Sequence, residues 1–353
     1  MDPKLTASSM KRPPLTLLAI AALCVVAIIM ALQPDSGQLD ADRETHFSID
    51  DTSRVTTIRI ADVQGGVALL ERSPHPLGLW KLNGRLLARK DATDLLLKTF
   101  KRVTVRQPVQ QSAKEGVLRM MASSGKRVDI CLDGKSDPAK TWFIGTPTQS
   151  HTGTHMLLEV PEYGRSGTPY ITHMEGFTGF LSTRFFTSEE EWRYTGIYES
   201  QPTEIQSITA RPLDDKGTEA SIEWAPDGET LTARSDLRPI EVSQTVIRDQ
   251  WLRMCKVHIE TWDSHLSPAQ EDSLIQTQPA WTLNVHYKDG RDIPMTLYWK
   301  TPIIEEYDLN GERMSHDGSR MYALVNGEVA LIQTFVFNPI LDFWRNLESP
   351  SAS

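Results

Sequence analysis

The sequence predicts an α+β protein: two copies of an antiparallel-sheet-plus-helix domain behind one N-terminal transmembrane helix. Three observations indicate this class. An uncharged apolar run of 18 residues stands near the N-terminus, strand-like runs recur about 150 residues apart, and each set is interrupted by an amphipathic helical pattern. Hairpins imply antiparallel pairing, and an amphipathic helix covers one face of a sheet.

Composition agrees with a folded body of two domains. The chain has 353 residues, of which 39% are hydrophobic and 24% charged, as in ordinary globular proteins. Its 37 basic and 46 acidic side chains give a net charge of −9, whereas a duplex-binding surface needs a clustered basic excess. We therefore expect no nucleic-acid partner.

The apolar run at residues 15–32 predicts a transmembrane anchor. As a helix it extends about 27 Å, enough to span the hydrocarbon core of a bilayer. Three basic side chains precede it, whereas Arg43 is the only basic one in the fifteen residues after it. The positive-inside rule then places residues 1–14 in the cytoplasm. Residues 33–46 are predicted to form a polar tether of at most about 46 Å.

Two alternatives to an uncleaved anchor are a signal peptide and a lipoprotein leader. A signal peptide has a shorter apolar region, usually about 7–15 residues, followed by a small-x-small cleavage site, which this run lacks. A lipoprotein would need a small residue before Cys24, where Leu23 stands. We therefore favour the anchor.

Each half opens with three short strand-like runs separated by turn residues. In the first half they are Val55–Ile60, Val67–Glu71 and Leu79–Asn83, and in the second Ile205–Ala210, Ala220–Trp224 and Thr230–Ala233. The entry strands are offset by 150 residues.

Two helices follow in each half. Apolar positions recur at helical spacing behind the cap candidate Asp91. The predicted stripes are Ala92, Leu95, Leu96, Thr99, Phe100 and Val103 in the first half, and Val246, Ile247, Trp251, Met254 and Cys255 in the second. Capping-box patterns at Ser112–Glu115 and Ser267–Gln270 predict the starts of two shorter helices, the latter with Pro268 at its first position.

The clearest match between the halves is a pair of alternating strands that end in Asp-Gly. These are Val128–Gly134 and Leu283–Gly290, and Asp-Gly is a strong hairpin signal because both turn residues take positive φ. The predicted strands that follow are Trp142–Ile144, Met156–Val160 and Tyr170–His173 in one half, and Met295–Trp299, Met321–Val325 and Val329–Thr334 in the other. Each half thus reads β-β-β-α-α-β-β-β-β. We predict domains at 47–195 and 196–347, with a tail at 348–353.

Between the halves runs an aromatic link, Gly176–Trp192, whose end carries a third capping-box pattern at Ser188–Glu191. Its counterpart is Phe335–Trp344, and both resemble a strand end that turns into a helical cap. The candidate partner-docking residues are Phe177, Phe180, Phe185, Phe186 and Trp192, since aromatic anchors dominate interface energetics. The alternative, which we favour, is that these rings form a core between the domains.

Several separated motifs carry a resemblance to a known family. They are Phe47–Asp51, Trp80, Asn83-Gly84, Ala88–Ala92 leading into Leu95–Thr99, Gly145–Thr148, Gly153-Thr154, the Gly176–Trp192 link and Arg320–Val325. Over about residues 45–345 the chain resembles the bacterial domain-of-unknown-function family 4340, in its anchored, duplicated Bacteroidota form. The resemblance implies a periplasm-facing inner-membrane protein and implies no activity. Related domains accompany gliding-type ABC transporter components, which is an analogy only.

Motifs for catalysis are incomplete. Gly134-Lys135-Ser136 lacks the first glycine of a phosphate-binding loop, and Gly164–Gly167 lacks the spacing of a nucleophile elbow. His151 and His155, with His173 and Glu175 downstream, are the one candidate metal constellation, but Gly153 argues against the helix that would bring the first two together. We assign no catalytic, cofactor-binding or metal residue. Carboxylate clusters such as Glu189–Glu191 are expected to be solvated surface.

The expected function is that of a scaffold or accessory subunit of an envelope complex, not an enzyme. Its partners would be envelope or inner-membrane proteins, and residues 15–32 would hold it in the membrane. The alternatives are an accessory subunit of an ABC-type exporter and a periplasmic hydrolase that uses the His151/His155 region. The acidic loop Ile304–Arg320, which has no equal in the first half, is either a functional insertion or a solvated loop. Cys131 and Cys255 are expected to be buried thiols, the alternative being a disulfide across the domains.

Overall fold

The structure, a computed structural model, describes residues 44–213, 217–307 and 310–348. It is α+β and its sheets are antiparallel, as predicted. The predicted anchor at 15–32, the N-terminal segment 1–14 and most of the tether lie outside the described residues. Within them, no helix has the length and apolar character needed to cross a membrane.

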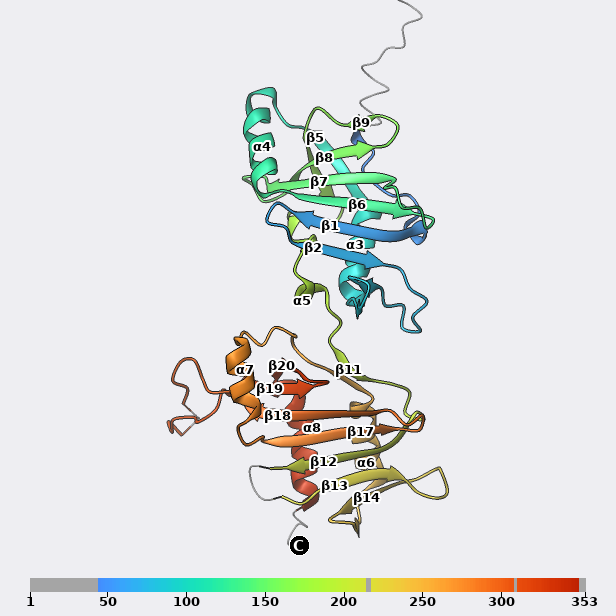
Figure 1. The fold of residues 1–353 in the computed structure, drawn as a ribbon, viewed down its shortest axis with the longest axis vertical. Helices are drawn as coiled ribbons and strands as arrows, with labels where there is room; N and C mark the ends of the chain where they lie inside the picture. The colour runs from blue at the N-terminus through green and yellow to red at the C-terminus, as the bar shows by residue number, and fades with distance from the viewer. Residues whose placement is uncertain (1–43, 214–216, 308–309, 349–353) are drawn as a thin grey trace, which may run out of the picture. The chain divides into compact units, whose positions relative to one another are not determined.

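The first sheet has strand order β4-β3-β2-β1-β6-β7-β8-β10-β5, with β9 paired to β8 (Figure 1). Its strands are β1 (Val55–Asp62), β2 (Val67–Glu71), β3 (Lys81–Leu82), β4 (Leu86–Leu87), β5 (Val103–Pro108), β6 (Lys126–Leu132), β7 (Lys140–Pro147), β8 (Thr154–Val160), β9 (Gly164–Arg165) and β10 (Tyr170–Met174). The helices of this half are α3 (Lys90–Arg102) and α4 (Gln111–Ser124), with 3₁₀ turns η1 (Thr52–Arg54) and η2 (Ser182–Arg184) and the short α5 (Glu189–Trp192).

The second sheet has strand order β15-β14-β13-β12-β17-β18-β19-β20. Its strands are β12 (Ile205–Pro212), β13 (Ala220–Trp224), β14 (Leu231–Ser235), β15 (Arg238–Ile240), β17 (Trp281–Tyr287), β18 (Asp292–Trp299), β19 (Arg320–Val325) and β20 (Glu328–Gln333). A separate pair joins β11 (Gly196–Glu199) to β16 (Lys256–His258). The helices are α6 (Gln244–Met254), α7 (Pro268–Ile275) and α8 (Thr334–Glu348).

The two sheets have the same order of corresponding strands. Strands β1, β2, β3 and β4 correspond to β12, β13, β14 and β15, and strands β6, β7, β8 and β10 correspond to β17, β18, β19 and β20. These eight strands occupy the same successive positions in the two sheets. The edges also agree. Strand β5 pairs with β10, and Thr261, just after β16, forms a single bridge with Leu331 of β20.

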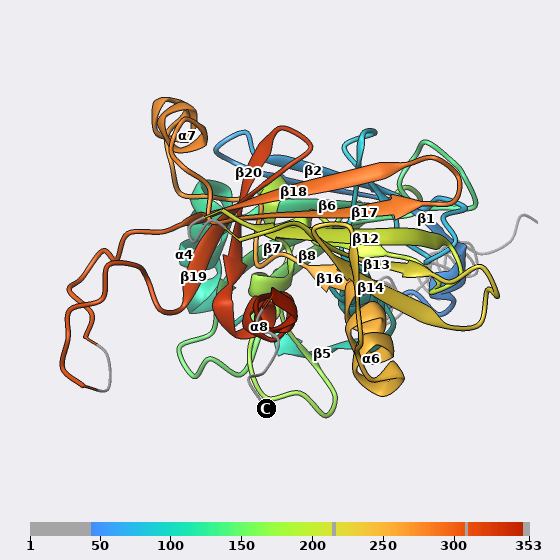
Figure 2. The same cartoon turned by 90° about the horizontal axis from the view of Figure 1, so that it is seen from below.

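Side chains of the second sheet alternate between two apolar layers. Leu297 belongs to the main core with α6 and α8, whereas the next residue, Tyr298, belongs to a smaller cluster with Leu274 of α7. This period of two is the signature of a strand covered on both faces. Figure 2 shows α6 and α8 side by side on one face of the sheet and α7 on the other.

The first sheet has the same two layers. On one face Phe100 of α3 meets Trp142 of β7 edge to face, with ring centroids 5.0 Å apart. On the other face Val117 and Met121 of α4 pack with Leu157 of β8. An amphipathic helix therefore covers one face of the sheet in each half, as predicted.

The chain enters the first sheet through a short stapled segment. Lys140 Nζ on β7 donates to the carbonyl oxygens of His46 and Ser48, both at 2.6 Å. Glu44 Oε2 accepts hydrogen bonds from Ser166 Oγ and Tyr170 Oη, both at 3.0 Å. These contacts fix the start of the described chain against the first sheet.

For two residues of the predicted helical stripes the expected burial is wrong. Leu95 is 41% exposed and Val246 is 49% exposed, whereas Leu96, Phe100 and Ile247 are buried. Successive helical residues are about 100° apart, so the residue beside a buried one sits at the margin of the stripe. In α3 the fully buried side chain of Thr93, and not that of Leu95, belongs to the stripe that faces the sheet.

The predicted helix starts are partly right. Ser267 caps α7, its backbone N–H donating to Gln270 Oε1 at 2.8 Å, and Pro268 is the first helical residue. Ser188 caps α5. Asp91 and Ser112 do not cap, because α3 begins at Lys90 and α4 at Gln111, which places both residues inside the first turn.

Of the two Asp-Gly turns, one has the predicted geometry. Asp133 and Gly134 have φ of 56° and 73°, and this turn closes through Lys135 N–H to Leu132 O at 3.1 Å. In the second half only Gly290 of the pair has positive φ, and the shorter link between β17 and β18 closes through Gly290 N–H to Tyr287 O at 3.0 Å and Tyr287 N–H to Arg291 O at 2.9 Å.

The predicted strand pattern missed short strands and one long helix. Strands β4, β5, β11, β15 and β16 have two to six residues. Most are too short to show an apolar alternation, and in β5 the alternation is limited to Val103–Arg106. The segment Phe335–Trp344 is helical throughout, as part of α8, so it is not the counterpart of the aromatic link, where the helical pieces are short. Pro339, which favours a helix break, lies inside α8.

We predict that Leu96→Ala destabilises the protein by about 2–5 kcal/mol, because it removes a fully buried side chain from α3. Leu95→Ala, one residue away and exposed, is the matched control and should change the free energy of unfolding by less than about 0.5 kcal/mol. Chemical denaturation measures both. Equal losses in the two variants would contradict the assigned helix face.

Candidate functional site

The aromatic docking candidates do not form one exposed surface. Phe185 and Trp192 are fully buried, and the Trp192 indole N–H donates to the Phe186 carbonyl at 2.8 Å. Phe180 and Phe186 are half-buried, and Phe177, at 38%, is the one exposed member. A docking role for this link stays a prediction, and two of its five rings are inside the fold.

The histidines of the candidate metal constellation lie on different elements. His151 is in the β7–β8 loop, with φ of 55° and its ring 5.7 Å from that of Phe180. His155 is on β8, where burial lowers the pKa of its ring and the Thr146 carbonyl lies 3.0 Å from Nδ1. His173 is on β10 beside Thr104. Among the described residues, no three His, Cys, Asp or Glu side chains are grouped so as to hold a metal ion.

The two cysteines of the body are buried thiols and form no disulfide. Cys131 Sγ donates to the Ser136 carbonyl at 3.6 Å. Burial, together with the negative charge of Glu204, raises the pKa of Cys255 to about 11, so this thiol is protonated at neutral pH. The preferred expectation of two thiols is confirmed.

A hollow in the second half lies between α6 and α8. It has a volume of about 760 Å³, in the range of ligand-binding pockets. We call it the α6–α8 groove. Both helices are firmly seated: Gln244, at the start of α6, hydrogen-bonds the backbone N–H and C=O of Leu231, and Trp344 of α8 is fully buried.

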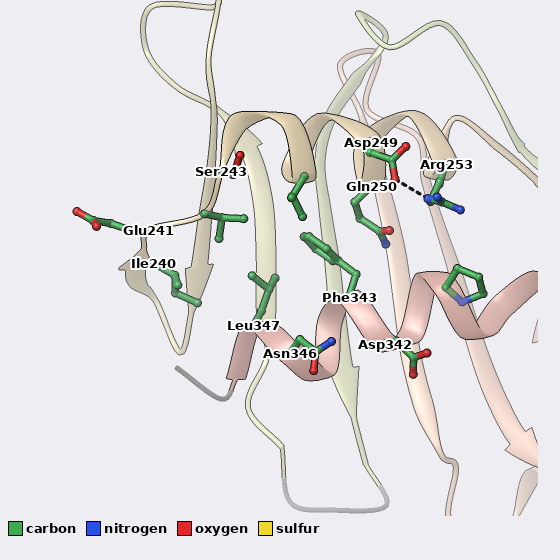
Figure 3. Close-up of a pocket in the computed structure, with 13 residues that line it drawn as sticks. Ile240, Glu241, Ser243, Asp249, Gln250, Arg253, Asp342, Phe343, Asn346 and Leu347 are labelled. Atoms are coloured by element: carbon green, nitrogen blue, oxygen red, sulfur yellow. Dashed lines mark hydrogen bonds and ion pairs between the residues drawn. The ribbon is translucent and has the colours of Figure 1, made fainter. Parts of the chain in front are cut away.

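Apolar side chains line the groove together with two amides, Gln250 and Asn346, and Ser243. Gln250 of α6 and Phe343 and Leu347 of α8 point toward one another across the gap (Figure 3). Gln250 is 2% exposed, and its Nε2 donates to the Ile340 carbonyl of α8 at 3.4 Å. Val246, half exposed, lines the same space. The solvent-accessible apolar surface of the groove therefore comes mainly from Val246 and the partly buried Phe343, since Leu347 is 8% exposed.

The rim of the groove is acidic. Glu241, Asp249 and Asp342 line it, against one basic lining residue, Arg253. Arg253 pairs with Asp249 at 2.8 Å, and Asp342 lies 3.7 Å from Arg345, which is outside the lining. The surrounding half has the same sign: residues 193–353 contain 25 acidic and 14 basic side chains, whereas residues 44–192 contain 17 and 19. The groove is thus suited to an apolar group that carries positive charge.

Sequence reasoning missed this groove, although a signal for half of it exists. The buried residues Phe337, Ile340, Leu341, Trp344 and Leu347 follow helical spacing. The interpretation as a strand end, with Pro339 in the middle, concealed this pattern. The groove itself joins residues about 90 positions apart, which no local pattern connects.

The acidic loop singled out in the sequence is rooted in the second sheet. Lys300 Nζ and Asp317 Oδ2 form an ion pair at 2.6 Å, with side chains 11% and 7% exposed. Burial by itself raises the pKa of the Asp317 carboxyl, but hydrogen bonds from Lys300 and Ser319 and the charge of Lys300 outweigh it and lower that pKa to about 2. The pair closes the loop at its base.

Comparison of the chain with family models, curated proteins and solved structures gives no significant match. The resemblance to family 4340 therefore stays a prediction.

We predict that the Lys300–Asp317 pair makes stability depend on acid pH. The folded-state pKa of Asp317 lies below the unfolded value of about 3.9, so its contribution is present above about pH 4 and is lost as the pH falls toward 2. The difference in unfolding free energy between wild type and Asp317→Asn should shrink by about 2 kcal/mol between pH 5 and pH 2. Urea titrations at each pH test this, and a difference that stays constant would refute it.

Proposed function

We propose that this protein is a single-pass inner-membrane scaffold or accessory subunit whose periplasmic body holds a segment of a partner protein in the α6–α8 groove. The observation that supports it is the groove itself, an accessible apolar floor with an acidic rim between two firmly seated helices. Anchoring through residues 15–32 rests on the apolar run and its flanking charges.

We infer that the two halves, 47–195 and 196–347, derive from an internal duplication. The shared strand order and the recurrence of strand motifs at a nearly constant offset support this inference. Helix α8 differs from the short helical pieces that follow the last strand of the first half, and it forms one wall of the groove.

The occupant of the groove is a protein segment with apolar side chains and at least one lysine or arginine. Charge complementarity favours it, because three acidic side chains line the groove against Arg253 alone, and of these Asp249 pairs with Arg253 and Asp342 with Arg345. The chain's own flanking segments do not fit by composition. Residues 349–353 read Ser-Pro-Ser-Ala-Ser, and residues 33–43 contain three aspartates and one arginine.

We predict that Val246→Glu reduces the amount of partner protein that co-purifies at least tenfold. The new carboxylate lies among apolar side chains of the groove and would be buried without a partner when the segment binds. Leu252→Glu is the matched control: it lies on the same helix, is 56% exposed and does not line the groove. Both variants should melt like the wild type. Quantitative mass spectrometry after mild-detergent purification of the full-length protein measures recovery.

Equal recovery by Val246→Glu and wild type would reject the groove as the docking site while leaving the scaffold role standing. Should no protein co-purify with the wild type above the level of an unrelated anchored control, the scaffold role itself would be rejected. Recovery of an ABC-type ATPase would assign the complex to an exporter.

A topology test addresses the anchor separately. A reporter fused after residue 40 should be active if it requires export and inactive if it requires the cytoplasm, because the positive flank keeps residues 1–14 inside. The reverse pattern would overturn the proposed orientation.

A further inference from the structure

The loop between β18 and β19 is an insertion that the fold does not need. The corresponding link in the first half, between β7 and β8, has six residues and closes through Thr148 N–H to Gly153 O at 2.9 Å. The β18–β19 link has twenty, residues 300–319. Both views show it reaching away from the second sheet (Figures 1 and 2). We call residues 300–319 the arm.

The base of the arm is built firmly. Besides the Lys300–Asp317 ion pair, the Asp317 backbone N–H donates to the Lys300 carbonyl at 2.7 Å. The rings of Trp299 and His316 stack with centroids 4.5 Å apart and planes 11° apart. The two ends of the arm are thus tied together and to the sheet, which limits how far the arm can fold back.

In the arm an acidic side chain is turned inward and apolar side chains are exposed. Glu306 turns inward: its carbonyl accepts from the Met314 N–H at 2.8 Å and its carboxylate from the Gly318 N–H at 2.9 Å. The apolar side chains face solvent instead, with Ile303 90% exposed, Ile304 78% and Tyr307 58%. A solvated loop gains nothing from exposing two adjacent isoleucines, whereas a docking element needs them.

The charge of the arm indicates which kind of surface could bind Ile303, Ile304 and Tyr307. The sequence of the arm has five acidic residues, Glu305, Glu306, Asp308, Glu312 and Asp317, and two basic ones, Lys300 and Arg313. Lys300 pairs with Asp317 at 2.6 Å and Arg313 with Glu305 at 3.2 Å, so the arm keeps a net negative charge. An anionic lipid surface repels such a segment. A second arm of the same chain would bring like charges together, which is also unfavourable.

We propose that the arm is a second docking element, distinct from the α6–α8 groove, which inserts Ile303, Ile304 and Tyr307 into an apolar cleft rimmed by lysine or arginine on a partner protein. The firm base holds the apolar tip in place before binding, so little conformational entropy is lost on docking. The acidic flanks steer the arm toward the basic rim.

A photoreactive benzophenone side chain at position 304 of the full-length protein, in its native membrane, tests the proposal. The matched control is the same probe at Leu237, which is 85% exposed in the β14–β15 turn at the opposite edge of the sheet order. We expect a defined protein adduct from position 304 at least tenfold above that from 237. The cross-linked partner peptide, sequenced by mass spectrometry, should contain apolar residues flanked by lysine or arginine.

Two further measurements complete the test. The adduct should decrease in 0.5 M salt, which screens the charges at the rim. With the probe at Tyr307, the double change Ile303→Ser and Ile304→Ser should reduce the adduct at least tenfold without changing Tm, since both side chains are exposed. Adducts to lipid alone, to a second copy alone, or of equal yield from 237 would each overturn the proposal. Loss of thermal stability in the double variant would also overturn it.

Discussion

The architecture depends on one constraint: a wide antiparallel sheet must bury an apolar face that no single helix is broad enough to cover. Eight strands about 4.8 Å apart span roughly 34 Å, whereas a helix with its side chains is about 10 Å across. In the second half α6 covers part of the face and α8 covers the next part. The α6–α8 groove lies between these two helices on the same face of the sheet. The candidate site therefore results from the same packing that buries the core.

Much of the fold could be predicted because its signals are local. Alternating runs such as Val67–Glu71 and Ala220–Trp224 became strands with the predicted bounds, and Ser267 with Pro268 marked a helix start correctly. The errors lie where tertiary contacts override local preference. Strand β5 exists because β10 offers it a partner, and α8 continues through Pro339 because Phe337 and Trp344 on either side are buried.

The candidate site was less accessible to sequence reasoning, for the same physical reason. Aromatic density along the chain pointed to the link, yet Phe185 and Trp192 are used for internal packing. Accessibility decides which apolar residues serve a partner, and accessibility is set by neighbours distant in the chain. The arm was noticed from its charge, but only the inward turn of Glu306 shows that its isoleucines face outward.

The hydrogen bonds that hold residues 44–48 to the first sheet determine how the protein responds to a pulling force. A pull on the chain ahead of Glu44 loads first the hydrogen bonds of Glu44 to Ser166 and Tyr170, and then those of Lys140 to His46 and Ser48. These are a few separate bonds, whereas the strands behind them are held by continuous ladders. We expect these separate bonds to break under load before the strand ladders do, so the described chain ahead of the first sheet can extend while the sheets stay folded.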